Sequence, residues 1–240
     1  MGILSLLLLT PAIGILILAL VPGQNTNQIR LVANLIAAVA FLLSCWLVVI
    51  YDIQDGSLQF TEQFVLNPKL GTAFALGVDG LSLPMVVLAT LLTSIALLAS
   101  FNITNSVKGY HISILMLQFG MVGVFLSQDW SLFYIFWELT LIPLFLLIAR
   151  WGGVRRNVAS INFVLYTMGG SIFMLISLLA ISQYMPVHGG TLMSSMTIAA
   201  QSMPKNEQIW VLLGFLIGFG AKMPVFPLHG WLPFAHVNAP

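Results

Sequence analysis

Long apolar runs separated by short polar junctions dominate this chain of 240 residues. A helix needs about 20 mostly apolar residues to cross the hydrocarbon core of a bilayer. Runs of this kind occupy residues 3–21, 29–51, 82–101, 110–127, 131–149, 159–184 and 208–226. The runs are continuously apolar rather than alternating, which excludes the strands of a membrane β-barrel. The pattern therefore predicts an all-α integral membrane protein with seven transmembrane helices.

Two junctions are long enough to hold structure of their own. The stretch SLQFTEQFV lies within residues 52–81 and alternates between polar and apolar positions, which predicts a short β-hairpin outside the membrane. The stretch TLMSSMTIAAQSM lies within residues 184–208 and predicts a short helix at the membrane interface.

The composition supports the membrane assignment. Hydrophobic residues make up 59% of the chain and charged residues only 6%, whereas a soluble domain carries about 25% charged residues. The formal net charge of +1 provides no basic surface for nucleic acid, so lipids are the expected surroundings. Residues 1–20 lack a positive segment and a cleavage site, and are expected to remain as a span. The single cysteine, Cys45, excludes an internal disulfide.

The basic residues predict the orientation of the chain. Those at the junctions after the first, third and fifth spans are Arg30, Lys108, Arg150, Arg155 and Arg156. The junctions after the second, fourth and sixth spans contain only Lys69 and Lys205 as basic residues. Because Lys and Arg collect on the cytoplasmic side, the N-terminus is predicted to face the outer or lumenal side.

Two charged residues, Glu138 and Lys222, lie outside these junctions and within predicted spans. Glu138 is about 12 Å along the helix from Trp130, and Lys222 is about 21 Å from Gln208, at 1.5 Å per residue. A charge at this depth costs about 2.5–3.5 kcal/mol on insertion scales. The functional interpretation is a proton relay, in which an acid adjusts how readily a buried lysine gains or loses a proton. The alternatives are a structural salt bridge, or a lysine that extends to the inner surface.

A cluster of prolines follows Lys222 in the stretch GFGAKMPVFPLHGWLP. Pro224, Pro227 and Pro233 have no backbone N–H, so the last span is predicted to break just after Lys222. Broken helices of this kind carry ion sites in transporters. An ordinary proline-rich loop after the span is the alternative.

Other polar residues are weaker candidates. His229 and His236 lack the neighbouring ligands of a metal site, and a role in the relay is secondary to hydrogen bonding within the loop. In the sixth span, the hydroxyl groups and the glycine pair are expected to serve mainly in helix packing. These residues are Tyr166, Thr167, Ser171, Gly169 and Gly170.

Four stretches of the chain resemble those of one family. They lie within residues 77–240, except that the first begins one residue earlier. They are LGVDGLSLP around Asp79, FWELTLIP around Glu138, NFVLYTMGGS in the sixth span and FGAKMPVFPLHGWLPFAH around Lys222. Together they resemble the antiporter-like membrane subunits of respiratory complex I. The similarity is greatest to chain M, also called subunit 4, and to its D-subunit counterpart in photosynthetic type I NAD(P)H dehydrogenases.

The resemblance implies the N-terminal half of a fold of about fourteen helices built as inverted repeats. Residues 1–101 would form three N-terminal transmembrane helices with an outer loop near residues 52–81. Residues 102–240 would form the first antiporter-like repeat, incomplete at its C-terminal end, with a second half beyond Pro240.

The resemblance also implies a function. The chain would be a proton-translocating subunit of an NAD(P)H- or ferredoxin:quinone oxidoreductase, an enzyme complex in which this subunit has no redox centre. Glu138 and Lys222 match the glutamate and lysine that gate proton uptake in the family. No cofactor is expected on this chain, since quinone, iron–sulfur clusters and any flavin would belong to other subunits. The expected partners are other membrane-arm subunits of a large hetero-oligomeric complex, in a thylakoid, bacterial inner or mitochondrial inner membrane.

Three residues depart from the family pattern. Phe234 and Asn238 replace the usual aspartate and glutamate of the loop after the broken helix. Asn162 replaces a lysine that is frequent in the family before the phenylalanine of the sixth span. These changes suggest a specialised form, such as one adapted to carbon dioxide uptake.

Two other functions fit the same pattern. One is a subunit of a multi-subunit sodium/proton antiporter, which shares the fold, although the stretches WELTLIP and DGLSLP favour the complex I type. The other is a membrane scaffold with no part in transport.

Overall fold

A computed structural model describes residues 2–67, 71–185 and 190–240. Lys69, which entered the orientation argument, lies outside these residues. The chain forms two compact units, one of Met1–Phe64 with Phe74–Ser127 and the other of Val65–Ala73 with Gln128–Pro240. The described elements are helical except for two strands, which agrees with the predicted all-α membrane fold.

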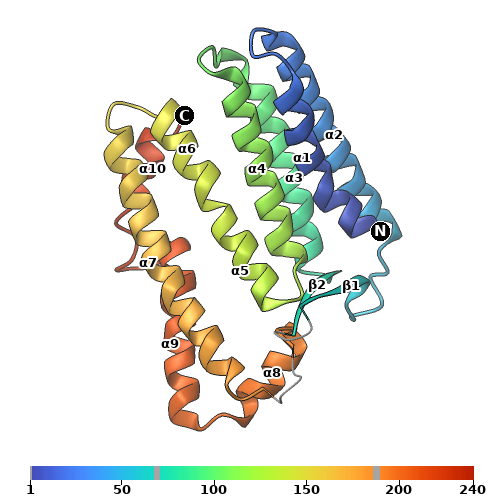
Figure 1. Cartoon of the computed structure of the whole chain (residues 1–240), viewed down its shortest axis with the longest axis vertical. Helices are drawn as coiled ribbons and strands as arrows, with labels where there is room; N and C mark the ends of the chain where they lie inside the picture. The colour runs from blue at the N-terminus through green and yellow to red at the C-terminus, as the bar shows by residue number, and fades with distance from the viewer. Residues whose placement is uncertain (1, 68–70, 186–189) are drawn as a thin grey trace. The chain divides into compact units, whose positions relative to one another are not determined.

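The first unit contains four long helices that lie side by side, from α1 in blue to α4 in green (Figure 1). They are α1 (Ile3–Leu20), α2 (Thr26–Ile50), α3 (Ser82–Ala99) and α4 (Val107–Leu126), with the short 3₁₀ helix η1 (Ser100–Asn102) extending α3. Small residues on the buried face of α2, among them Ala33, Ala37 and Ala40, recur every three or four positions. Such a stripe lets neighbouring helices approach closely without a side chain between them.

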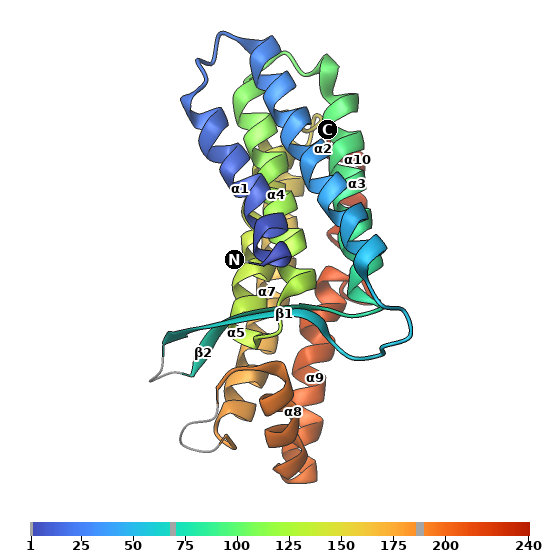
Figure 2. The same ribbon diagram turned by 90° about the vertical axis from the view of Figure 1, so that its right-hand side faces the viewer.

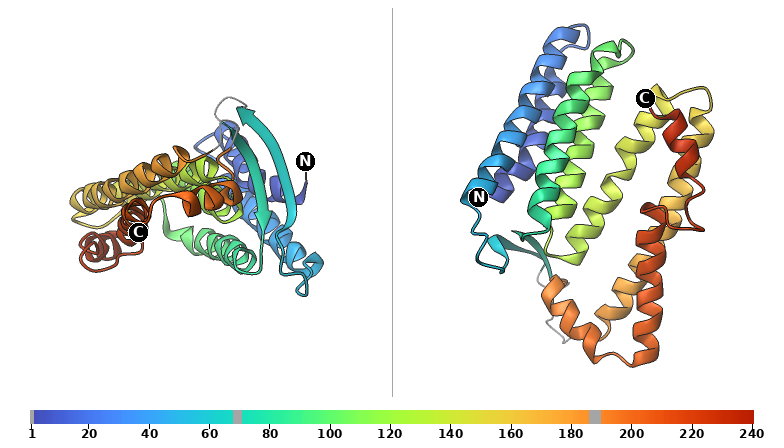
Figure 3. Two further views of the ribbon diagram at one scale, coloured as in Figure 1. Left: turned by 90° about the horizontal axis from the view of Figure 1, so that it is seen from below. Right: turned by 180° about the vertical axis from the view of Figure 1, so that it is seen from behind.

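The second unit contains the remaining helices. They are α5 (Trp130–Leu139), α6 (Leu141–Trp151), α7 (Arg156–Ser182), α8 (Met193–Ser202), α9 (Lys205–Lys222) and α10 (Leu232–Asn238). α9 packs along α7, as the orange-red and gold ribbons of Figure 3 show, and α6 and α10 also pack against α7. α7 is therefore the element on which the rest of this unit is assembled.

Six of the described segments are long and apolar enough to cross a membrane: α1, α2, α3 with η1, α4, α5 with α6, and α7. The seventh expected span, residues 208–226, corresponds to α9, which begins three residues earlier and ends at Lys222. α9 has 18 residues and carries three charged side chains, Lys205, Glu207 and Lys222, which makes it the most polar of the expected spans.

Both long junctions contain the elements that their sequences predicted. The strands β1 (Gln59–Asn67) and β2 (Thr72–Val78) pair in a two-stranded sheet and run side by side in Figure 2, which confirms the predicted hairpin. α8 confirms the short helix predicted between the sixth and seventh spans. Its position at the membrane interface stays a prediction.

Glycine allows the close approach of α7 and α9. A Cβ atom on Gly218 would lie 2.7 Å from the Cβ of Met174, and one on Gly170 would collide with the Cβ of Ala221. Gly170 therefore has the packing role that the sequence suggested, whereas a Cβ on Gly169 would meet open space. The close approach matters because Ala221 directly precedes Lys222, so this contact fixes the end of α9.

Asp129 fixes the start of α5 and hence the position of Glu138 along that helix. Its carboxylate is fully buried and accepts hydrogen bonds from the backbone N–H groups of Ser131 and Leu132, at 2.9 and 3.1 Å. It also accepts from the N–H of Ala73 and from the hydroxyl group of Thr191, at 3.1 and 2.6 Å. An acidic N-cap is a common way to satisfy the first N–H groups of a helix. Here the same carboxylate also holds two distant segments at the helix start.

Candidate functional site

The span that carries Glu138 is interrupted near its middle. α5 ends at Leu139 and α6 begins at Leu141, with Thr140 between them. Pro143 has no N–H group, so the carbonyl of Leu139 loses the donor that a continuous helix would provide. α5 and α6 together form the single span that the sequence analysis expected over residues 131–149, and the interruption at Thr140 is a local feature within it. It opens the backbone within one turn of Glu138.

The last long helix ends at Lys222, as predicted. Pro224 has no N–H to offer the carbonyl of Gly220, which instead accepts a hydrogen bond from the N–H of Val225 at 2.9 Å. The carbonyl of Ala221 accepts from the indole Nε1 of Trp231 at 2.7 Å. The carbonyl groups of Gly220 and Ala221 are therefore bound within the protein, as membrane depth requires.

The two interruptions meet at the ammonium group of Lys222. Its Nζ donates to the carbonyl oxygen of Trp137 at 2.9 Å and to the hydroxyl Oγ1 of Thr140 at 2.8 Å. It also lies 3.9 Å from the centre of the Trp137 ring, within the range of a cation–π interaction. The cation thus binds polar groups at the α5–α6 junction.

Glu138 acts on this lysine through space. It is half-buried at the end of α5 and interacts electrostatically with Lys222 and with the hydroxyl group of Tyr134. Between these two described residues, Glu138 and Lys222, the structure places neither a hydrogen bond nor a close ion pair. Glu138 and Lys222 are therefore near enough to interact electrostatically without a direct contact.

The structure places the two histidines apart from this cluster. His229 and His236 are exposed, the first in the segment after α9 and the second in α10. The ring of His229 lies 5.5 Å from that of Phe226. Within the described ranges, no group of three or more His, Cys, Asp or Glu side chains is placed to hold a metal ion.

The hydroxyl groups of α7 mostly bond to their own helix. Thr167 donates to the carbonyl of Phe163 at 2.6 Å and Ser171 donates to that of Met168 at 3.0 Å, whereas Tyr166 is 41% exposed. The hydroxyl that reaches Lys222 is instead that of Thr140, which the sequence analysis did not single out. Its position two residues after Glu138 and three before Pro143 is the signal that would have identified it.

Asn238, one of the residues that depart from the family pattern, has a structural role. Its side-chain oxygen accepts from the N–H of Arg155 at 3.0 Å, and its carbonyl accepts from the N–H of Gly153 at 2.9 Å. Its side-chain nitrogen donates to the carbonyl of Phe234. Asn238 thus joins the end of α10 to the basic loop before α7.

A wall of aromatic rings in mutual contact extends from the lysine to the middle of α9. On α5 these rings belong to Trp130, Phe133 and Trp137, and on α9 to Phe215 and Phe219. Neighbouring rings have centres 5.3–6.2 Å apart. This wall shields the Lys222 cluster on one side and carries no group that can exchange protons.

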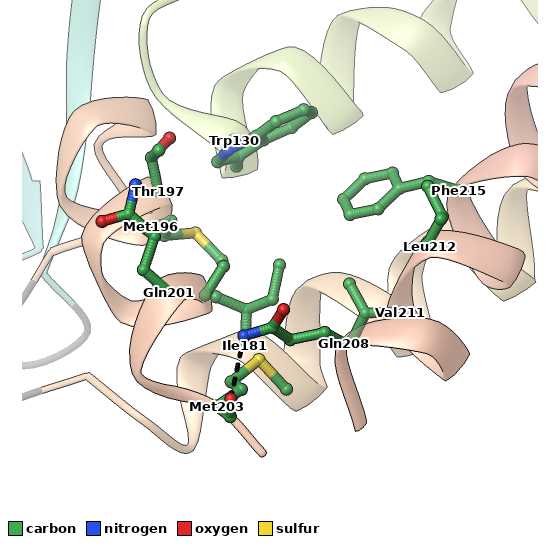
Figure 4. A pocket seen from close by; sticks show the side chains of 11 residues that line it. Trp130, Ile181, Met196, Thr197, Gln201, Met203, Gln208, Val211, Leu212 and Phe215 are labelled. Carbon is green, nitrogen blue, oxygen red and sulfur yellow. Dashed lines mark hydrogen bonds between the residues drawn. The ribbon is translucent and has the colours of Figure 1, made fainter. Parts of the chain in front are cut away.

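The aromatic wall ends at a cavity of about 360 Å³, between α8, α9 and the ends of α5 and α7 (Figure 4). Trp130 and Phe215 line one side, while Met196 and Ile181 line another. Gln208 is the polar side chain near its base, where it donates to the carbonyl of Met203 at 2.9 Å. Among the described residues, the side chains that line this cavity include no titratable group.

Comparison with known proteins finds matches among membrane subunits of multi-subunit complexes. Residues 127–240 match the family described as NADH:quinone oxidoreductase/Mrp antiporter, TM. A relative named NAD(P)H-quinone oxidoreductase chain 4 1, from Picosynechococcus sp. (strain PCC 7002), is 41% identical over 233 residues. The match covers 95% of this chain and 42% of the relative, so the chain spans less than half the length of that protein.

Two solved structures show the same fold. The first is a chain of respiratory complex I from Thermus thermophilus with bound NADH, with 28% identity and a TM-score of 0.85 over 98% of this chain and 47% of that one. The second is a chain of the Mrp complex from Dietzia sp. DQ12-45-1b, with 20% identity and a TM-score of 0.80 over 97% of this chain and 25% of that one. The second likeness establishes the fold alone.

Proposed function

From the membership of this chain in the NADH:quinone oxidoreductase/Mrp antiporter family of membrane subunits, we propose that it forms part of a proton-translocating subunit of an NAD(P)H- or ferredoxin:quinone oxidoreductase. The complex would reside in an energy-transducing membrane, with the N-terminus on the outer or lumenal side. Quinone, iron–sulfur clusters and any flavin would lie in other subunits, and the partners of this chain would be neighbouring membrane-arm subunits.

The relay we propose consists of Glu138 and Lys222. The observation that carries it is the position of the Lys222 ammonium group, which binds the α5–α6 junction and feels the charge of Glu138 without a direct bond to it. A partly buried cation loses its proton more readily when a nearby negative charge is neutralised. Protonation of Glu138 would therefore favour release of a proton from Lys222.

The geometry allows Lys222 to stay hydrogen-bonded in both charge states. As an ammonium group it donates to Thr140 and to the Trp137 carbonyl. A neutral amine has a lone pair, and the Thr140 hydroxyl group, which now donates to the Trp137 carbonyl at 2.8 Å, can rotate to donate to that lone pair. Proton loss thus leaves no buried polar group without a partner, which keeps the neutral state accessible.

The substitution Glu138→Gln tests this relay. It keeps the size of the side chain and removes its charge, so we expect proton translocation coupled to quinone reduction to fall, on the order of 10²-fold for loss of one proton-transfer group. Translocation is measured with a pH-sensitive dye in vesicles that contain the whole complex. Glu207→Gln, the same change in the α9 N-terminal turn outside the relay, should pump normally. Normal pumping by Glu138→Gln would disprove the relay.

The same preparation separates the proposed function from a sodium/proton antiporter and from a scaffold. Quinone reductase activity of the purified native complex, with peripheral redox subunits present, supports the oxidoreductase. Sodium-dependent proton exchange without those subunits would support the antiporter instead. The 41% identity to a chain 4 relative favours the oxidoreductase, whereas the Mrp match is one of fold. If the purified complex shows neither activity, the result supports the membrane scaffold.

A further inference from the structure

Three side chains in the unit of α1–α4 have buried polar atoms with no partner among the described residues. These atoms are Nε of Arg30, Nε2 of His111, and both Nε2 and Oε1 of Gln118. His111 and Gln118 on α4 are 0% exposed. Buried polar groups in proteins almost always have a hydrogen-bond partner, from the chain or from ordered water. Four orphan atoms within one helical unit therefore call for partners other than protein side chains.

The atoms of Arg30 and His111 have complementary requirements. The Nδ1 of His111 lies 2.8 Å from the carbonyl of Val107, which can only accept, so Nδ1 carries the proton and Nε2 of the neutral ring is an acceptor. The Nε–H of Arg30 is a donor, and Arg30 interacts electrostatically with His111. The orphan donor and the orphan acceptor are not bonded to each other. A water molecule can accept from the first and donate to the second.

Gln118 has a complementary neighbour on α1. Lys108 donates to the carbonyls of Ala19 and Val21, and Gly14 lies against Leu115, so α1 and α4 run antiparallel. Gln118 lies one turn beyond Leu115 on α4. Pro11 lies one turn before Gly14 on α1, and the antiparallel direction places these two residues near the same level. Pro11 has no N–H group, so the carbonyl of Leu7 lacks its usual helical donor. The Gln118 amide, whose donor and acceptor lack partners among the described residues, therefore lies near the level of the proline turn of α1.

We propose that the α1–α4 unit binds internal water at two positions along one face of α4, one between Arg30 and His111 and one at the carboxamide of Gln118. His111 and Gln118 are seven residues apart, which places them on one face about 10.5 Å from each other along the helix. Globular proteins hold about one buried water per 27 residues, usually at polar groups that lack other partners. Two buried water molecules in the α1–α4 unit would not exceed that frequency.

The substitution Gln118→Met distinguishes a hydrated site from a dry one. If water is bound, methionine displaces it and leaves its other partner unpaired, so the melting temperature of the chain in lipid nanodiscs should fall by about 2–4 °C. If the site is dry, removal of an unpaired amide should raise it. Leu115→Met, an apolar exchange at an equally buried position on the same helix, is the matched control and should change little. An increase in the melting temperature for Gln118→Met would overturn the proposal.

A second measurement uses the unaltered chain, so it does not depend on how a variant folds. Brief X-ray irradiation produces hydroxyl radicals from bound water, and these radicals oxidise the side chains beside it. Mass spectrometry should then find His111 oxidised despite its complete burial. Met174 is also 0% exposed and is itself readily oxidised, and it serves as the reference. Oxidation of His111 at or below the level of Met174 would refute the water position beside it.

Discussion

At the scale of the residue, the chemistry concentrates on Lys222 and the groups that receive its hydrogen bonds. The two acceptors, the Trp137 carbonyl and the Thr140 hydroxyl, both lie at the junction of α5 and α6. Glu138 contributes charge, and Thr140 contributes a donor or acceptor according to the state of the lysine. The threonine is therefore as much a part of the proposed relay as the acid.

The pair of substitutions Thr140→Val and Thr140→Ser tests that role. Valine keeps the shape of threonine and removes the hydroxyl group, and a hydrogen bond to a charged group contributes about 1.5–3 kcal/mol. We expect Thr140→Val to lower the number of protons moved per quinone reduced, while Thr140→Ser keeps it near normal. Both are measured in vesicles that contain the complex. Equal pumping by the two variants would show that the hydroxyl group takes no part.

At the scale of the element, charged side chains distant in sequence bind the ends of helices. Glu62, in strand β1, accepts hydrogen bonds from the N–H groups of Gly2, Leu4 and Ser5 at 2.8–3.1 Å and from the hydroxyl group of Ser5. Lys108 donates to the last carbonyls at the opposite end of α1. An acid at the N-terminus and a base at the C-terminus also complement the helix dipole. The β1–β2 pair thus stabilises the first span.

The contact of Glu62 predicts an acid-sensitive step in stability. Burial by itself raises the pKa of Glu62, but the hydrogen bonds from Ser5, Gly2 and Leu4 outweigh it and lower the pKa below its ordinary value of 4.5. A lowered pKa in the folded state means that the stabilisation is present above pH 4.5 and is lost as the pH falls below it.

We therefore expect Glu62→Gln to lower stability at neutral pH by about 0.5–2 kcal/mol, the usual effect of losing a helix cap. The variant and the unaltered chain should converge as the pH falls below 4.5, measured by thermal unfolding in nanodiscs. Glu207→Gln removes the same charge away from α1 and should not show this convergence. A constant difference between Glu62→Gln and the unaltered chain at every pH would contradict the cap.

At the scale of the whole molecule, the boundary between the two compact units matches the family comparison. The second unit takes in Gln128–Pro240, and the family match begins at residue 127. The proposed relay, its helix interruptions and its aromatic wall all belong to this unit. The division at residues 101 and 102 that the resemblance implied, between the N-terminal helices and the first repeat, stays a prediction.

The orientation of the whole chain is open to a direct test. In a background with Cys45→Ala, Asp55→Cys and Val154→Cys place single thiols in two exposed loops. The charge pattern predicts that Asp55→Cys reacts with a membrane-impermeant maleimide added from the outer or lumenal side, and that Val154→Cys reacts only after the inner side is opened. The reverse pattern would invert the predicted topology.

The sequence by itself determined the class of the protein, because apolar runs of about 20 residues have no stable alternative to spanning helices. It also determined the break after Lys222, since Pro224 cannot donate a hydrogen bond wherever it lies. The interruption at Thr140 left a similar signal in Pro143, which the long apolar run around it obscured.

Only the tertiary structure decided the partners of each polar group. Lys222 and Trp137 are 85 residues apart, and Glu62 and Leu4 are 58 apart. Periodicity describes one helix at a time, and the separations across which side chains meet depend on how helices pack. The close approach of α7 and α9 at Gly170 and Gly218 fixes the position of the end of α9, where Lys222 lies. Which carbonyl and which hydroxyl group accept the hydrogen bonds of Lys222 follows from that packing, because hydrogen bonds require contact within about 3 Å.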